Sequence, residues 1–147
     1  MTPQTPLSAD HGEIHDRLAL AARERGPIGE AAKRVARHFA QHAEKEEKLV
    51  APLLALLPRA ARERPDPAMA EALPRYDRLL ASIDDLAAEH RVISAGLEAL
   101  IAAARAEQRT EFAELAARLV DHMRLEESVI YPAALLAGRY LRLRFGD

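Results

Sequence analysis

The chain has 147 residues, of which 49% are hydrophobic, enough for one domain with a core of its own. Its 21 basic and 23 acidic residues nearly cancel, so charge gives no sign of nucleic acid or an acidic membrane surface as a partner. The lack of cysteine excludes disulfides, thiolate metal sites and cysteine nucleophiles. The feature to explain is a set of six histidines: His11, His15, His38, His42, His90 and His122.

The composition is typical of a helical protein. Ala, Leu, Arg and Glu are abundant and favour helix, whereas the β-branched and aromatic clusters that favour strands are scarce. We expect a single domain over residues 1–147. Glycine and proline divide it into predicted helices over about 8–25, 28–57, 74–108 and 110–137, followed by a short tail.

The first two predicted helices meet at Gly26–Pro27. Ser8 or Asp10 could cap the first of them, and Glu13, three residues after Asp10, would complete a capping box. No segment has the basic flank of a signal peptide or the roughly 18 apolar residues of a membrane span. We therefore expect a cytoplasmic protein that does not cross a membrane.

A longer proline-containing segment, from Pro58 to Pro74, connects the two halves of the chain. Pro74 is tolerated in the first turn of the third helix. Thr110 is expected to cap the fourth helix, and Gly138 stands where a C-cap glycine is expected. Four long helices with two short connections and one longer connection predict an all-α fold, an antiparallel up-down four-helix bundle.

The two halves repeat one pattern. The sequences HAEKEEKLVAP and HMRLEESVIYP begin at residues 42 and 122, so both read H-x-x-x-E-E with a proline ten residues after the histidine. Those prolines, Pro52 and Pro132, should kink or end their helices. Upstream, residues 10–14 and 89–93 both read acidic-His-x-x-Ile. The pattern predicts a pseudo-twofold repeat of a helical hairpin.

The spacing of the repeat indicates chemistry. Residues four apart lie about 40° apart around a helix, so His42 and Glu46 share a face, as do His122 and Glu126. Such a pair, taken alone, is usually solvent-exposed. Here it occurs twice, and His90 falls in an apolar stripe, where an unsatisfied imidazole is costly to bury. Two carboxylates buried side by side need cations, so the pattern indicates a metal site in the core.

Four imidazoles and two carboxylates suit two metal ions. Each ion would receive two nitrogens, while both glutamates and a hydroxide or oxide bridge the pair. This donor set suits iron or manganese, with zinc possible. It contains fewer anionic ligands than the ferritin-like sites, so it should stabilise high-valent iron less well. This favours binding, sensing or transfer of a small molecule over difficult oxidation reactions. Glu47 and Glu127 point away from the ligand face and are expected in solvent or behind the ligands.

The composite motif H…HxxxE…H…HxxxE, spread over four helices, resembles the hemerythrin-like family, also called the HHE cation-binding domain. The resemblance covers about residues 8–137 and implies a non-haem di-iron centre. It implies that the terminal ligands are His11, His42, His90 and His122 and that the bridging carboxylates are Glu46 and Glu126.

The chain departs from the oxygen-carrying members at two positions. Leu86 stands where those proteins have a second histidine one turn before the third-helix ligand. Glu126 stands four residues after the last histidine, where they use an aspartate at five. The missing fifth histidine argues against simple oxygen carriage.

Three functions remain open. The first is a protein that binds O2 or nitric oxide for sensing, storage or scavenging, rather than a dedicated enzyme. The second is a stress-response role, as an iron donor for the repair of iron centres or an enzyme that processes peroxide or nitric oxide. The third is a structural bundle with incidental zinc. The native metal and the oligomeric state are not fixed by the sequence.

Two histidines and one tyrosine fall outside the repeat. In an antiparallel hairpin, two residues at the same level have residue numbers that add up to a constant total. His15 and His38 give the same total as His11 and His42, so they should face each other one turn, roughly 5.4 Å, from the ligands. They could lie behind the ligands, supply an extra ligand or satisfy each other in the bundle. Tyr131 is expected to pack in the bundle, with ligation or proton donation as alternatives. The basic tail after Gly138 is expected to dock on the bundle or on a partner chain.

Overall fold

The computed structural model describes residues 5–146, and those residues form helices and no strand. The long helices are α1 (Pro6–Ala21), α2 (Pro27–Leu49), α5 (Leu73–Ala106), α6 (Thr110–Leu125) and α7 (Tyr131–Phe145). A π-helical segment, Glu126–Ile130, joins α6 to α7. The connection between the halves contains α3 (Ala51–Leu54), α4 (Leu57–Arg62) and the 3₁₀ helix Pro67–Ala72.

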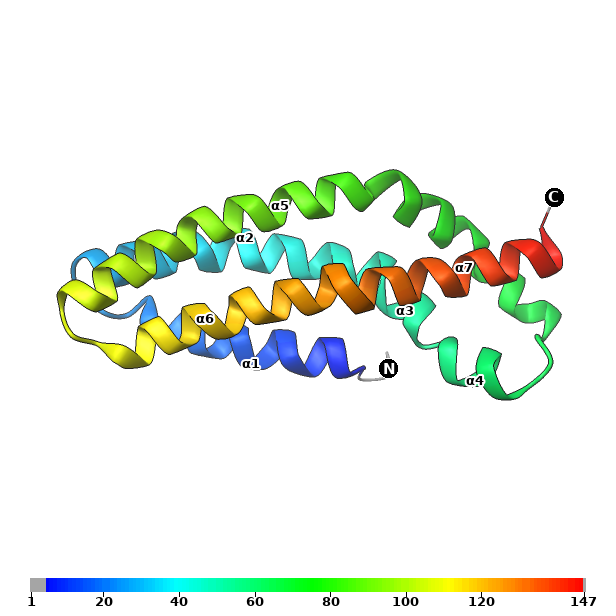
Figure 1. Ribbon diagram of the computed structural model, residues 1–147, viewed down its shortest axis with the longest axis horizontal. Coiled ribbons are helices and arrows are strands. Elements are labelled where there is room, and N and C mark those ends of the chain that lie inside the picture. Colours follow the sequence, from blue (N-terminus) through cyan, green and yellow to red (C-terminus); the bar gives the residue numbers. More distant parts are fainter. Residues whose placement is uncertain (1–4, 147) are drawn as a thin grey trace.

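The four helices α1, α2, α5 and α6 form an up-down bundle (Figure 1). Each runs antiparallel to its neighbours, and the pairs in contact are α1 with α2, α2 with α5, α5 with α6 and α6 with α1. Helix α7 continues the line of α6 beyond the bundle and packs against the helices of the connection. The predicted all-α bundle is confirmed. In the described part of the chain, no helix is both long and apolar enough to cross a membrane.

The N-terminus of α1 differs from the prediction. Thr5 is the N-cap, and its hydroxyl accepts a hydrogen bond of 3.2 Å from the Ser8 backbone N–H. Pro6 then occupies the first helical turn, where its fixed φ favours helix. The predicted capping box is therefore wrong: Asp10 and Glu13 lie inside the helix, and their side chains bind Arg118 of α6.

The second predicted helix is shorter than expected. Helix α2 ends at Leu49 rather than near residue 57, and the short helix α3 begins at Ala51. Pro52 lacks the N–H that would continue the ladder, which explains the break. Pro132 has a milder effect: the chain stays helical around it, and the Tyr131 N–H bonds to the carbonyl five residues back.

Gly138 is not a C-cap. It lies inside α7, which continues to Phe145. A Cβ atom at this position would lie 2.1 Å from Tyr76 Cδ2, so the glycine allows α7 to approach the Tyr76 ring closely. The predicted tail is therefore helical and docked: Leu141 is buried, and Phe145 packs against the same apolar cluster.

The predicted Thr110 cap is also wrong, because Arg109 occupies that position and makes no capping hydrogen bond with its side chain.

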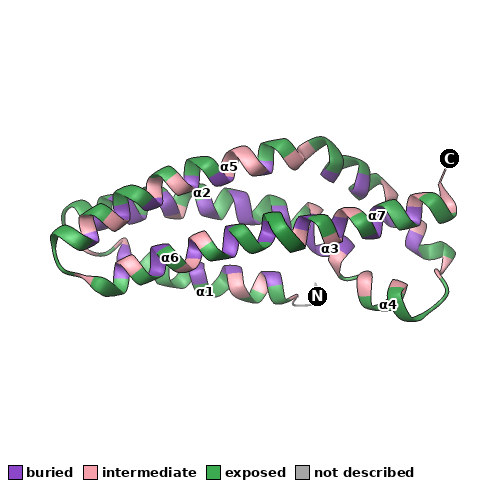
Figure 2. Ribbon diagram, viewed as in Figure 1, coloured by how far each residue is buried: buried purple, intermediate pink, exposed green. Residues whose placement is uncertain are grey.

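Buried apolar residues form two clusters along the bundle axis. One lies toward the two short hairpin turns and includes Ile14, Phe39, Ile93 and Leu119. The other lies toward the long connection and includes Leu7, Val50, Leu86, Tyr131 and Leu141. Buried positions follow the inward faces of the helices (Figure 2). Where each helix of the bundle passes from one cluster to the other, it carries buried polar side chains, which together form a polar layer.

Candidate metal centre

The polar layer interrupts the apolar stripe of each helix. In α1 the buried sequence runs Leu7, His11, Ile14, and in α5 it runs Leu86, His90, Ile93. These steps of three and four residues keep the imidazoles on the core face. Among the described residues, the buried polar or charged side chains are His11, His42, Glu46, His90, His122 and Glu126. The six residues predicted from the repeat are therefore brought together in the core.

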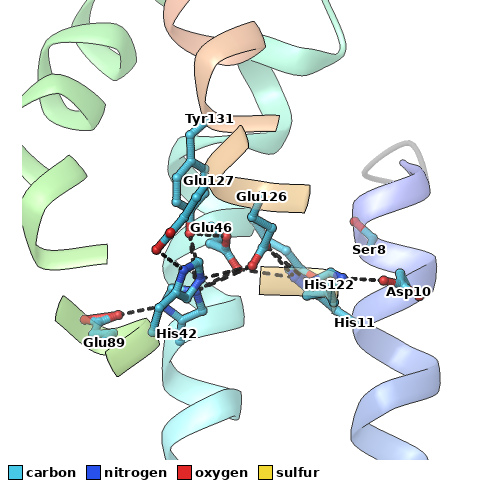
Figure 3. Close-up of polar contacts among 12 residues, drawn as sticks. Ser8, Asp10, His11, His42, Glu46, Glu89, His122, Glu126, Glu127 and Tyr131 are labelled. Atoms are coloured by element: carbon cyan, nitrogen blue, oxygen red, sulfur yellow. Dashed lines mark hydrogen bonds and ion pairs between the residues drawn. The ribbon is translucent and has the colours of Figure 1, made fainter. Parts of the chain in front are cut away.

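Glu126 lies between three imidazoles. Its Oε1 is 3.1 Å from His90 Nε2, and its Oε2 is 3.2 Å from His122 Nε2 and 3.4 Å from His11 Nε2. The carboxylate is fully buried. Figure 3 shows it pointing into the space among the histidines, with His42 on one side and His11 and His122 on the other.

Glu46 is the second fully buried carboxylate. Its Oε1 lies 3.1 Å from His42 Nε2 and 3.3 Å from His11 Nε2. Its Oε2 accepts a hydrogen bond of 2.5 Å from the hydroxyl of Tyr131. The same hydroxyl lies 3.4 Å from His42 Nε2 and 3.2 Å from His90 Nε2. Tyr131 thus touches the site directly in addition to packing in the core.

The histidines pair across the two hairpins. The His42 and His90 ring centroids lie 4.5 Å apart, and those of His11 and His122 lie 5.0 Å apart. Two sets of donor atoms lie close enough together to hold an ion, with each set's atoms within 4.8 Å of one another: His42, Glu46, His90 and Glu126 form one, and His11, His122 and Glu126 form the other. We refer to these as the His42/His90 end and the His11/His122 end. Glu126 belongs to both.

Four outer carboxylates, Asp10, Glu47, Glu89 and Glu127, face the other nitrogens of the imidazoles. His42 Nδ1 is 2.9 Å from Glu89, His90 Nδ1 is 2.8 Å from Glu127, and His122 Nδ1 contacts Asp10 (Figure 3). An imidazole that donates its Nδ1–H outward presents the Nε2 lone pair inward, as a metal ligand must.

The His11 Nδ1 atom is the exception. It lies 3.6 Å from Glu47, too far for a hydrogen bond, and it is buried without a partner. The acidic residues before His11 and His90 are part of the sequence repeat, but their role was not predicted. Asp10 and Glu89 each bind the histidine of the opposite hairpin, and only the packing of the hairpins reveals that contact.

Two surface cations extend this network. The Arg118 Nη2 atom is 3.0 Å from Asp10, and the Lys45 ammonium contacts Glu89. Burial raises the pKa of Asp10, but Arg118 and His122 outweigh it and lower the pKa overall. Burial likewise raises the pKa of Glu89, while Lys45 and His42 lower it. Both carboxylates are therefore held ionised beside their imidazoles.

The inner groups affect one another's ionisation. Burial alone lowers the pKa of His11, but contacts with Glu126 and Glu46 raise it to about 10. The pKa values of His42, His90 and His122 are raised by the same opposition of burial and neighbouring carboxylates. Burial raises the pKa of Glu126, yet the surrounding histidines hold it far below its usual range. Without a metal, the positive charge of protonated imidazoles balances the negative charge of the buried carboxylates.

The residues fit a metal. Glu46 Oε1 and His122 Nε2 are buried and have no hydrogen-bond partner, although carboxylate and imidazole atoms lie a little over 3 Å away. The Glu46 atom belongs to one donor set and the His122 atom to the other, so each set has a buried atom with a lone pair free for an ion. Imidazole nitrogen and carboxylate oxygen together suit iron, manganese or zinc.

His15 and His38 do not face each other. Both are exposed, and they line different pockets, His15 beside His11 and His38 beside His42. Their residue numbers place them at one level of the bundle, but the interior at that level is filled by Ile14 and Phe39. Neither histidine belongs to the buried polar set.

The fold and the buried donors define a metal-binding four-helix protein. The sequence profile described as the hemerythrin HHE cation binding domain matches residues 2–134. The chain belongs to this family. Comparison with curated proteins and with solved structures gives no match.

Proposed function

We propose that this protein binds two iron ions and uses the pair to take up O2 or nitric oxide for sensing, storage or scavenging. The observation that carries the proposal is the buried cluster of four imidazoles and two carboxylates, which balances its charge only with protons or cations. The family match supports a bound cation.

The geometry supports two ions better than one. The donor atoms fall into two sets that share Glu126, while Glu46 lies within 3.3 Å of histidines from both ends. Each ion would receive two imidazole nitrogens, and both carboxylates would bridge. The same residues would hold manganese or zinc. Iron is the proposed metal because its change between ferrous and ferric states supplies the electrons that binding of O2 requires.

The outer carboxylates support the same function. Three of the four inner histidines have Nδ1 fixed by a carboxylate, so the rings keep their orientation and tautomer before an ion arrives. Preorganised donors favour rapid and tight metal uptake. They also keep an imidazole-rich environment, which suits reversible binding of a small molecule.

The first test is metal content. Protein purified without added metal should contain about two irons per chain, as a bridged pair requires, and Glu126→Gln should lose most of them because Glu126 belongs to both ends. Glu114→Gln, at an exposed position of α6, is the matched control and should keep the wild-type content. Wild-type protein with no iron, before and after anaerobic ferrous loading, would overturn the proposal.

The second test is ligand binding. Anaerobic ferrous protein mixed with O2, or separately with nitric oxide, should develop a visible absorption band that disappears when the gas is removed. Reversal supports binding. Net consumption of O2, nitric oxide or peroxide would instead indicate a processing enzyme, and iron-loaded protein that binds neither gas would contradict the proposed role.

A further inference from the structure

A second group of charged side chains lies outside the metal centre, between α2 and α5. Lys45 and Lys48 stand on α2, and Arg75 and Arg78 stand on α5. All four are exposed and line one pocket with a volume of about 450 Å³. The pocket lies toward the long connection, where the ribbon of α5 bends near its start (Figure 1). The whole chain has a net charge of -2, so this concentration of positive charge is local.

The pocket combines positive charge with apolar surface. The two cations on each helix are three residues apart, so they lie on one side of that helix. Leu49 and Pro52 add apolar surface, and both are partly exposed. Of the described residues in the lining, one is a carboxylate: Glu47, whose Oε1 lies 3.6 Å from His11 Nδ1. The single anion of the lining therefore already faces a buried imidazole.

The two arginines have no internal partner. Within the described part of the chain, neither Arg75 nor Arg78 makes an ion pair, and the carboxylate between them, Asp77, binds Arg142 instead. A guanidinium presents its N–H donors in a fixed plane that matches the oxygens of a phosphate. The α5 side of the pocket therefore offers two arginines that are available for an anion.

The two lysines have partners that an anion can replace. Lys48 Nζ lies 2.8 Å from Glu44, but these side chains are 71% and 67% exposed, and exposed ion pairs contribute little free energy. The Lys45 ammonium contacts Glu89, the carboxylate that bonds to His42. Lys45 thus belongs both to the pocket and to the polar contacts around the metal centre.

We infer that this pocket binds a small molecule that carries a diphosphate, or a similar pair of anionic groups, joined to an apolar or aromatic portion. Four cations from two helices suit more than one anionic group, while Leu49 and Pro52 suit the rest of the molecule. The site is separate from the metal centre, so failure of the anion test leaves the proposed iron function intact.

Calorimetry tests the class of ligand. The full purified chain is titrated with ADP, pyrophosphate, inorganic phosphate or adenosine, with no metal ion added. We expect ADP to bind most tightly, the two inorganic ions more weakly because they lack a part that contacts the apolar surface, and adenosine not at all. Salt should weaken ADP binding, because it screens exposed charges. A chain that binds neither ADP nor pyrophosphate, or that binds adenosine as tightly as ADP, would overturn the proposal.

A double substitution tests the location. Arg75→Gln combined with Arg78→Gln should weaken ADP binding about tenfold or more, since hydrogen bonds to charged groups are lost. The matched control combines Arg34→Gln with Arg37→Gln, which are exposed, three residues apart on α2 and outside this pocket. It changes the net charge equally and should bind ADP like the wild type. Circular dichroism shows that both variants are folded, and equal weakening in the two would overturn the location.

Glu89→Gln tests the part assigned to Lys45. The amide removes the negative charge that the Lys45 ammonium contacts, so the cation becomes available and ADP should bind about two- to fivefold more tightly. Glu98→Gln, at an exposed position of the same helix, should bind ADP like the wild type. All three proteins are treated with the same chelator, so that iron content does not differ. Unchanged affinity in Glu89→Gln would contradict the shared role of Lys45.

A phospholipid headgroup offers the same phosphate chemistry, and sedimentation with vesicles separates the two sources. Vesicles of phosphatidylcholine and phosphatidylglycerol should leave the wild-type chain in the supernatant, because the pocket is a recess between two helices. Sedimentation with the vesicles that the Arg75 and Arg78 substitutions abolish, in a chain that does not bind ADP, would overturn the assignment of a small molecule.

Discussion

Glu89 connects a buried imidazole to a surface ammonium. It bonds to His42 Nδ1 and to the Lys45 side chain, so one exposed cation helps to fix a residue in the core. Asp10 does the same for His122 with Arg118 as its cation. These contacts join residues of different hairpins, and His42 and His122 thereby gain an orientation that their own helices do not supply.

Glu89→Ala should weaken iron binding without unfolding the protein. Loss of the partner of a ligating histidine typically costs 10–100-fold in metal affinity, and we expect a loss within roughly that range. Competition with a chelator measures it. Glu98→Ala, on an exposed position of the same helix, should bind iron like the wild type. A Glu89→Ala protein with unchanged affinity would show that the outer carboxylate is dispensable.

The metal-free protein should lose stability as the pH rises. The pKa of His11 is raised from 6.5 to about 10 in the fold, and the other inner histidines shift in the same direction. A raised pKa stabilises the fold fully below the unfolded value, and that contribution disappears as the pH passes the folded value. Denaturant unfolding should therefore show falling stability between about pH 6.5 and pH 10.

The iron-loaded protein provides the comparison for this prediction. Metal binding requires neutral imidazoles, so its apparent affinity rises as protons leave. Loaded protein should then lose less stability than metal-free protein over the same pH range. Parallel curves for the two forms would indicate that the histidines do not bind the metal.

The helix boundaries can be predicted from the sequence where glycine or proline stands at the end of a segment with helical periodicity. Gly26, with φ of 77°, and Pro27 separate α1 from α2 as predicted. The α5–α6 turn depends instead on Gln108 at φ of 57°, which residue preference does not indicate. The predicted C-cap at Gly138 is wrong: a glycine after an apolar run predicts a helix end, but this glycine lies inside α7. Its actual role depends on Tyr76 of α5, a partner that local sequence does not reveal.

Gly138→Ala should destabilise the protein. The added methyl would lie 2.1 Å from Tyr76 Cδ2, so the ring or helix α7 must move, and overpacking of this kind costs about 1–3 kcal/mol. Chemical denaturation measures the change. Gly12→Ala on α1 is the matched control, because an added Cβ there has nothing within 4 Å and should stabilise the helix by up to about 1 kcal/mol. Equal effects would contradict the close packing of α7.

At the scale of the molecule, the predicted buried residues and the hairpin repeat are both present. The burial of the six inner residues could be predicted because residues on one face of a helix recur with its period. The pairing of His42 with His90 and of His11 with His122 could not, because periodicity fixes the face of a residue and not how one hairpin packs on the other. The same applies to His15 and His38: their numbers predict their level along the hairpin but not that both are exposed.

Iron should raise the thermal stability of the whole domain. The inner residues come from all four bundle helices, so unfolding any helix releases the metal, and ligand at 100 times its Kd stabilises by about 2.7 kcal/mol. Scanning calorimetry should show a higher Tm with iron than with chelator. Glu126→Gln should show little difference, and an equal rise in that variant would indicate binding elsewhere.

The pairing of histidines across hairpins has a consequence for a chain that cannot form disulfides. Each pair joins one hairpin to the other, and the peptide link between the hairpins is the long connection around α4. A bound metal pair would therefore act as a cross-link between the two halves. If a protease cut the connection near residue 64, loaded protein should migrate as one particle, and removal of the metal should weaken the association of the two fragments.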